Sequence, residues 1–435
     1  MHQGVLSRLT VGDSGRTHAG NPTLLIAYRV RAWLSNAPLP RLRQIVIALY
    51  FTIALFDAAG KALAAHPAVN RVLMQRVSAT STEEMREAAN PSGNFEIFRT
   101  ASRHLVSGID LYAEYPGEHS DRFKYSPTFA LLFAPFAWMS WPLALFLWST
   151  LNALVLFVAV ERALPGRAGL LAMLYLLLEV LRGMQNAQSN ALVAGLIILA
   201  FTALERANAW RGATAVVLGA CVKIFPLAAL TFAIPRRLAV RTGVWALVVG
   251  TGLVLLPLLV TSPPTLAAQY GWWRGVESSD AQQRWFSVME LVHRWTGTSW
   301  PNWPMQLAGT LVLVAPLVLR RHRWDDARFR FLYLCSLLLY VVLFNHQAER
   351  ASYLIAFVGA TLWYAGSARV RWQSWMYGIA FVSIPLMSTL VPGAFFRTPT
   401  ATLYRLAIPA LAIWLTVQWE MLRNRAGVVS EGIGE

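Results

Sequence analysis

Apolar stretches approaching or exceeding about 20 residues recur along most of the chain, separated by shorter polar segments. A helix of that length crosses a hydrocarbon core of roughly 30 Å. Two stretches are interrupted, because Pro135 breaks residues 127–139 and Lys223 and Pro226 break residues 213–234. We therefore expect an all-α polytopic membrane protein, a bundle of about 10–12 transmembrane or re-entrant helices.

Composition and charge support the membrane assignment and indicate an orientation. Hydrophobic residues make up 56% of the chain and charged residues 14%, against about 25% charged residues in soluble domains. The net charge of +16 comes from arginines spread over short segments, whereas a nucleic-acid-binding protein gathers its basic residues in one patch. By the positive-inside rule these short segments are cytoplasmic. We expect two cytoplasmic termini, an extracytoplasmic active face and no nucleic-acid partner.

This orientation divides the chain into three parts, of which one is embedded in the membrane. Residues 1–44 form a basic cytoplasmic segment, residues 45–422 a single transmembrane domain and residues 423–435 a cytoplasmic tail. Two long polar segments of the domain, residues 66–126 and 261–302, fall outside. We expect a multi-pass protein of the cell membrane whose potentially reactive groups gather on the extracytoplasmic side.

The first external segment contains a predicted amphipathic helix. Phe95, Phe98, Ala101 and Leu105 recur at helical spacing after Asn94, a residue type that favours the N-cap. We expect this face to lie on the outer leaflet. The polar face, which is either simply solvated or turned toward a lipid phosphate and a sugar, carries Glu96 and Arg99.

Further polar motifs follow at the ends of apolar stretches. Residues 108–112 read GIDLY and include Asp110, and Asp121 precedes the FKYSP sequence of residues 123–127. Within it, Lys124 and Tyr125 offer a cation and a hydroxyl at the membrane boundary, where both residue types also serve as anchors. Two amides downstream bind sugar hydroxyls or cap a helix, namely Gln188 and Asn190.

Lys223 lies inside an apolar hairpin, where a lysine is costly unless it is paired or faces a polar cavity. Binding a lipid phosphate would satisfy its charge, and snorkelling to the interface is the alternative. His346, Glu349 and Arg350 follow a predicted span at its outer end, where they contact substrate or form a structural ion pair. The histidines have no metal-ligand spacing, so we expect no metal and no cofactor.

The order of these motifs resembles glycosyltransferase family 87. The amphipathic helix, GIDLY, FKYSP, the Gln188 and Asn190 pair and the V-K-x-x-P element at residues 222–226 occur in that order. The resemblance implies a GT-C fold and an inverting transfer of a sugar, often mannose. The donor would be a polyprenyl-phosphate-linked sugar and the acceptor a lipid or glycan on the outer face of the membrane.

The sequence departs from the family's pattern at one position. The catalytic aspartate that the resemblance implies heads a short D-x-x-[VI]-[YF] element, and the matching residue here is Asn94. An amide cannot accept a proton near neutral pH, so another carboxylate would have to act as the base. Glu96 is nearest, but two helical positions turn it about 200° away from residue 94. The other candidates are Asp57, Asp110, Asp121 and Glu349.

The candidate site residues fall into three groups. The expected catalytic residues are Glu96, Asn94 and Asp121. The expected ligands of the donor phosphate are Lys223, Lys124 and Arg99. The expected contacts to the rest of the substrates are Asp110, Tyr125, Gln188, Asn190, His346, Glu349 and Arg350.

Two other functions remain open from the sequence. A transporter or flippase for a lipid or lipid-linked sugar also has broken helices and an intramembrane lysine. Its binding groups would lie near the midplane between inverted repeats, and the sequence has no such repeat. A family member that lost catalysis at residue 94 and acts as a binding subunit is the other alternative.

Overall fold

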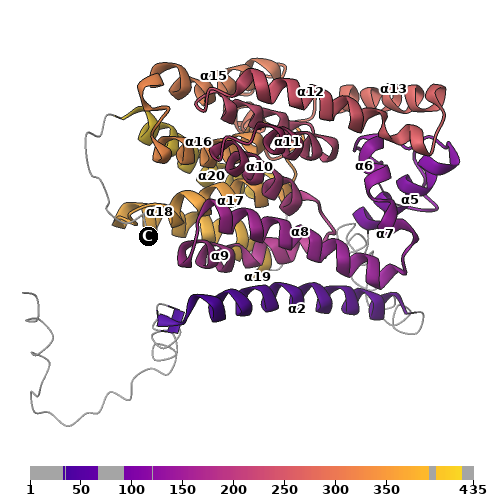
Figure 1. Ribbon diagram of the computed structural model, residues 1–435, viewed down its shortest axis with the longest axis horizontal. Coiled ribbons are helices and arrows are strands. Elements are labelled where there is room, and N and C mark those ends of the chain that lie inside the picture. Colours follow the sequence, from indigo (N-terminus) through magenta and orange to yellow (C-terminus); the bar gives the residue numbers. More distant parts are fainter. Residues whose placement is uncertain (1–32, 35, 67–92, 120, 391–397, 424–435) are drawn as a thin grey trace, which may run out of the picture. The chain divides into compact units, whose positions relative to one another are not determined.

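The computed structural model describes residues 33–34, 36–66, 93–119, 121–390 and 398–423 (Figure 1). Every regular element in these residues is a helix, which confirms the predicted all-α class. The chain divides into two compact units, Met1–Ile45 and Val46–Glu435. The first unit contains the start of helix α2 (Leu39–Ala65), and the elements described below belong to the second.

Several helices of the described part are apolar enough to lie in a bilayer. Five helical stretches are also long enough to cross it, namely α2, α8 (Trp141–Ala163), α9 (Arg167–Gln185), α12 (Ala239–Leu255) with its 3₁₀ extension η2 (Leu256–Leu259), and α20 (Pro399–Leu422). Shorter apolar helices are α10 (Asn190–Glu205), α11 (Ala209–Val222) and α15 (Trp303–Leu319). The chain is therefore a polytopic membrane protein, as its hydropathy pattern predicts.

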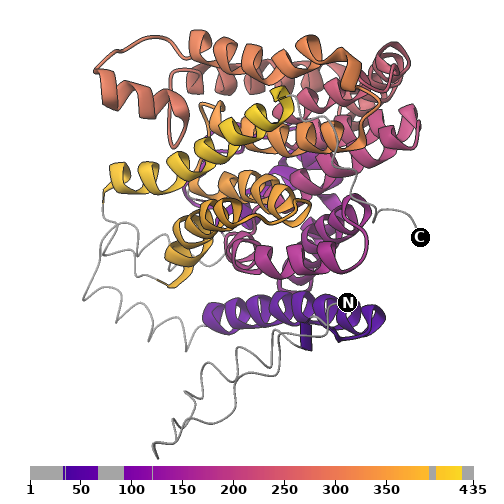
Figure 2. The same cartoon turned by 90° about the vertical axis from the view of Figure 1, so that its left-hand side faces the viewer.

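Two helices, α16 (Ala327–Leu343) and α17 (Tyr353–Ala365), are buried around almost their whole circumference. They pack against each other, and both contact α10 and α20, the yellow helix in Figure 2. A Cβ atom added at Gly359 would lie 2.8 Å from the carbonyl oxygen of Cys335. Only glycine fits there, so this small residue permits the close approach of α16 and α17.

The C-terminal half also contains five short elements, namely η3 (Arg321–Arg323), η4 (Arg350–Ser352), α18 (Arg371–Phe381), the π-helical η5 (Val382–Leu386) and α19 (Met387–Leu390).

Both interrupted apolar stretches break where their prolines predict. The first forms α6 (Pro127–Leu132) and α7 (Ala134–Trp138), and the hydroxyl oxygen of Ser126 caps α6 by accepting from the amide of Phe129. The second forms α11, then extended backbone at Lys223, then the 3₁₀ helix η1 (Phe225–Ala233), which begins next to Pro226. A proline cannot continue the hydrogen-bond pattern of a helix. The first stretch therefore breaks next to Pro135, and the second breaks at Lys223 and Pro226.

The predicted amphipathic helix is α5 (Gly93–Ser107), and its apolar face is covered by protein. The Phe95 and Phe98 side chains are fully buried, and their rings contact the ring of Phe133 edge-on with centroids 5.6 and 5.3 Å apart. Figure 1 shows α5 grouped with α6 and α7. The expectation that this face rests on the outer leaflet is therefore wrong, because α6, α7 and α8 supply the apolar partner.

The second long polar segment is largely helical, which its loop-like composition did not indicate. It forms α13 (Pro263–Asp280) and α14 (Val288–Thr296). The hydroxyl oxygens of Ser262 and Ser287 accept from the amides of Thr265 and Glu290 and cap the two helices. A serine N-cap followed by proline at the first helical position is a helix-start signal, and it is present at Ser262.

Arginines and carboxylates form ion pairs where α10 ends and α16 begins. The Arg330 guanidinium donates to both carboxylate oxygens of Glu205, at 2.7 and 2.8 Å. Arg236 donates to the Glu205 carbonyl oxygen at 3.1 Å, and Arg323 donates to the Asp326 carboxylate at 2.8 Å. We call these five residues the arginine end. It coincides with short segments that the positive-inside rule assigns to the cytoplasm.

Candidate active site

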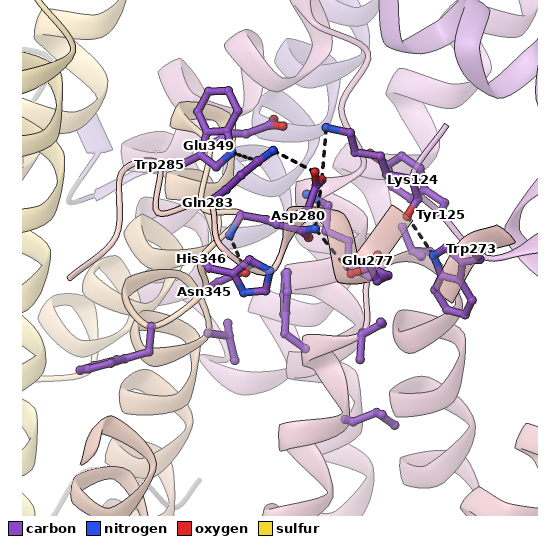
Figure 3. Close-up of a pocket in the computed structure, with 18 of the residues that line it drawn as sticks. Lys124, Tyr125, Trp273, Glu277, Asp280, Gln283, Trp285, Asn345, His346 and Glu349 are labelled. Atoms are coloured by element: carbon purple, nitrogen blue, oxygen red, sulfur yellow. Dashed lines mark hydrogen bonds and ion pairs between the residues drawn. The ribbon is translucent and has the colours of Figure 1, made fainter. Parts of the chain in front are cut away.

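A cavity of about 460 Å³ lies where the last residues of α11, α13 and α16 meet the segment that precedes α6. We call it the main cavity (Figure 3). Part of its wall is apolar and is formed by Val222, Ile224, Phe225, Leu227, Val341 and Phe344. The rest carries charged and amide side chains. A lining of this kind suits a ligand that has both a hydrocarbon and a polar part.

Two lysines from segments far apart in the sequence line the main cavity. Lys124 places its Nζ atom 3.6 Å from Oδ2 of Asp280 and 4.0 Å from Oδ2 of Asp121. Lys223 leaves α11 in an extended conformation, which carries its side chain off the helix and into the lining. No residue in the described part of the chain makes an ion pair or a hydrogen bond with its ammonium group. This ammonium group is therefore available to bind an anion such as a phosphate.

Helix α13 contributes two carboxylates one turn apart, Glu277 and Asp280. The amide nitrogen of Gln347 lies 3.5 Å from Oε2 of Glu277 and 3.4 Å from Oδ2 of Asp280, and Gln283 donates to Asp280 at 2.8 Å. Burial first, and then the charge of Asp280, raise the pKa of Glu277 above the ordinary glutamate value. A carboxylate with a raised pKa is a stronger base once ionised, which suits general-base catalysis.

The segment after α16 closes the polar side of the main cavity with Asn345, His346, Gln347 and Glu349. Nδ1 of His346 lies 3.3 Å from the amide nitrogen of Gln306, and its Nε2 atom is buried without a hydrogen-bond partner among the described residues. Burial lowers the pKa of His346, so the imidazole is neutral at pH 7. Its enclosed second nitrogen keeps an unused hydrogen-bonding capacity in the cavity wall.

Two tryptophans complete the lining. Trp273 donates its indole N–H to the carbonyl oxygen of Lys124 at 3.2 Å, which ties the ring to the segment that precedes α6. Trp285 donates to the side-chain oxygen of Gln283 and has a φ of 32°, in the left-handed region that non-glycine residues rarely occupy. Strain of this kind concentrates at ligand sites.

The main cavity brings together about half of the residues that the sequence singles out. Those that line it are Asn94, Asp121, Lys124, Tyr125, Lys223, His346 and Glu349. They come from four separated chain segments, so their convergence is a property of the tertiary structure.

Glu96 and Arg99 lie outside the main cavity lining, on faces of α5 that contact protein. Glu96 accepts a hydrogen bond from the indole nitrogen of Trp141. Arg99 donates to the carbonyl oxygens of Ala137 and Met139 at 3.2 and 3.1 Å. These contacts tie α5 to α7 and α8.

The other expected contacts also lie outside the lining of the main cavity. The Asp110 carboxylate accepts from the amide of Tyr112 at 2.8 Å and so stabilises a turn. Asn190 donates to Gln188 at 3.4 Å, beside the buried Trp148. Arg350 donates to the Ser388 carbonyl oxygen at 3.0 Å.

Asp57, another candidate base, lies on α2. There it forms an ion pair with Lys61 at 2.8 Å.

Sequence reasoning missed the two carboxylates of α13 and the amides around them. The composition of residues 261–302 indicates a polar loop, in which the spacing of Glu277 and Asp280 has no meaning. On a helix, three positions place both side chains on one face. The serine cap at residue 262 was the signal that could have found them.

Within the described residues, no group of three or more His, Cys, Asp or Glu side chains is arranged to hold a metal ion.

The sequence model of glycosyltransferase family 87 matches residues 123–345, just over half of the chain. The matched range contains Lys124, Lys223, Glu277 and Asp280, and Asn94 lies before it. No curated protein matches the chain.

Proposed function

The chain belongs to glycosyltransferase family 87 and is a membrane glycosyltransferase, and we propose that the main cavity is its active site. The donor in this proposal is a polyprenyl-phosphate-linked sugar, with mannose as the first sugar to test, and the acceptor is a lipid or glycan. One observation carries the proposal: unpaired Lys223, Lys124 and a carboxylate with a raised pKa line one cavity that also has an apolar wall.

The donor binds through its phosphate and through its prenyl chain. Its phosphate lies between Lys223 and Lys124, and the first isoprene units lie against Ile224, Phe225 and Leu227. Glu349 and Glu277 attract the Lys223 ammonium without touching it. A phosphate oxygen adds the direct contact, which compensates for the cost of placing a lysine at membrane depth.

Glu277 acts as the general base in this proposal. It accepts the proton of the acceptor hydroxyl while that oxygen attacks the anomeric carbon from the face opposite the phosphate. The new bond between the anomeric carbon and the acceptor oxygen forms as the bond to the phosphate oxygen breaks. The bonding electrons leave with the phosphate, where the lysines stabilise the charge, and the configuration inverts.

Asn94 has a binding role in this scheme. It lines the main cavity and donates from Nδ2 to the carbonyl oxygen of Asn186 at 3.0 Å, which fixes the orientation of its amide. Its side-chain oxygen is then an acceptor for a sugar hydroxyl, a contact that needs no proton transfer. Asp121, Tyr125, His346 and Glu349 are proposed as further sugar contacts.

The proposed active face is extracytoplasmic, with both termini in the cytoplasm. Helix α16 runs from the arginine end to the main cavity over 17 residues, or about 25 Å of helix. The positive-inside rule assigns the arginine end to the cytoplasm, which supports an outward-facing cavity.

A reconstitution experiment tests the proposal. Purified protein in liposomes is given radiolabelled polyprenyl-phosphate mannose, or the corresponding glucose donor, with a crude extract of membrane lipids as acceptor. We expect a labelled glycolipid to form. Movement of the donor across the bilayer without a product would indicate a transporter instead, and donor binding without either would indicate a binding subunit.

A further inference from the structure

A second cavity of about 270 Å³ adjoins the main cavity. We call it the side cavity. It lies between the turn of residues 114–119 and one face of α13, and Asp121, Arg122, Lys124 and Asp280 line both cavities. The two spaces therefore meet at the ion pair of Lys124 and Asp280, whose charged atoms are 3.6 Å apart.

The side cavity contains a buried polar group that has no partner in the described part of the protein. His119 is 8% exposed, and its Nδ1 atom makes no hydrogen bond with any described residue. Nδ1 itself is enclosed by protein, so the His119 ring lines the side cavity through its other atoms.

The wall beside His119 is held in place by its own contacts. Tyr115 donates its hydroxyl to the carbonyl oxygen of Asp110 at 2.5 Å, and its ring centroid lies 5.8 Å from that of His119. Arg122 donates from Nε to the Glu114 carboxylate at 3.0 Å. Asp110, which the sequence singles out, thus supports the side cavity through its backbone.

The two cavities differ in chemistry. The main cavity has a run of aliphatic and aromatic side chains from α11, η1 and α16, whereas charged and polar groups dominate the side cavity. Both of its cations already have carboxylate partners, since Arg122 pairs with Glu114 and Lys124 with Asp280. This pairing favours a neutral ligand rich in hydroxyl groups over a second phosphate or a prenyl chain.

We propose that the side cavity is the acceptor subsite and binds a neutral polyol head group, such as a sugar ring. The assignment rests on the proposed function, in which the main cavity holds the donor. A hydroxyl of the head group reaches the anomeric carbon at the junction formed by Lys124 and Asp280. Glu277, the proposed base, lies one helical turn before Asp280 and faces that junction from the main cavity.

Separate binding measurements for the main cavity and the side cavity distinguish the donor proposal from the acceptor proposal. Butyl β-glucoside serves as the polyol probe and polyprenyl phosphate as the donor-site probe, each titrated alone against purified protein in detergent. We expect Glu114→Gln and His119→Ala each to weaken butyl glucoside binding about tenfold, the effect of losing roughly one hydrogen bond. The dissociation constant of polyprenyl phosphate should not change, which also shows that the variants are folded.

Glu118→Gln is the matched control for Glu114→Gln. It makes the same chemical change four residues away, in a side chain that pairs with His104 at 3.1 Å and lines neither cavity. Its butyl glucoside affinity should equal that of the wild type.

Unchanged glucoside affinity in both test variants would overturn the acceptor subsite while leaving the donor proposal intact. Absence of polyprenyl phosphate binding to the wild type would overturn the donor proposal instead. Tighter binding of the anionic butyl glucuronide than of butyl glucoside would contradict the neutral head group.

Discussion

The arginine end and the main cavity are both rich in charged side chains, but they use them in opposite ways. At the arginine end, the guanidinium of Arg330 is matched by both oxygens of Glu205, with distances of 2.7 and 2.8 Å. In the main cavity, Lys223 has no such partner among the described residues, and burial raises the pKa of Glu277. Satisfied charges stabilise a fold, whereas charges left without partners beside a cavity are available to a substrate.

The largest expected effect is on Glu277. Glu277→Gln removes the proposed base while keeping the shape of the side chain, so kcat for transfer should fall by about 10²- to 10⁴-fold with little change in the melting temperature. Initial rates at a saturating donor concentration measure this fall in kcat. Glu290→Gln in α14 is the control, because that carboxylate accepts from Arg294 at 2.7 Å outside the lining. Full activity in Glu277→Gln would assign the base to another residue.

Lys223→Met tests the unpaired cation. Loss of one charge-assisted contact to the departing phosphate should lower kcat/KM by about 10²-fold, whereas thermal stability should hold or increase, because an unpaired charge is replaced by an apolar side chain. Lys61→Met provides the contrast, since Lys61 pairs with Asp57 at 2.8 Å and its loss leaves a carboxylate without its partner. If Lys223→Met lost stability and kept its rate, the lysine would be structural.

Glu205→Ala tests the paired charges of the arginine end. It leaves the buried guanidinium of Arg330 without its carboxylate and should cost about 3 kcal/mol of unfolding free energy, measured as a lower melting temperature in detergent. Transfer by the folded fraction should not change. Arg237→Ala breaks an exposed pair with Asp325 and should cost less than about 1 kcal/mol. Equal losses of unfolding free energy in the two variants would contradict the distinction between the buried ion pair and the exposed one.

Asp280→Asn tests the origin of the raised pKa through the pH–rate profile. The base must be ionised, so kcat falls as the pH drops through the pKa of Glu277. Removing the neighbouring negative charge lowers that pKa, and the acidic limb should move to lower pH. It should remain above the position typical of an exposed glutamate, because burial is the larger cause. A limb that stays in place would show that Asp280 does not act on the titrating group.

Glu96→Gln should have the smallest effect. Its carboxylate accepts from the Trp141 indole outside the main cavity, and the glutamine oxygen can accept the same hydrogen bond. Transfer rate and melting temperature should both stay close to the wild-type values, measured alongside Glu277→Gln. A loss of activity comparable with that variant would return the base to α5.

The sequence alone was sufficient for the parts of this protein that depend on local composition. Apolar stretches, arginine positions and proline breaks predict an all-α membrane protein and the interruption at Lys223, and apolar residues at helical spacing predict α5, which begins at Gly93 and includes Asn94, the expected N-cap. These features follow from hydropathy and from the geometry of proline, which act over a few residues.

Only the tertiary structure decided which polar side chains share a site. Glu96 and Glu277 look alike in the sequence, yet the Trp141 indole holds one away from the main cavity while α13 and Gln347 hold the other in its wall. Residues 124, 223, 277 and 346 are far apart in the chain. Their convergence depends on how α11, α13 and α16 pack, and no single segment carries that information.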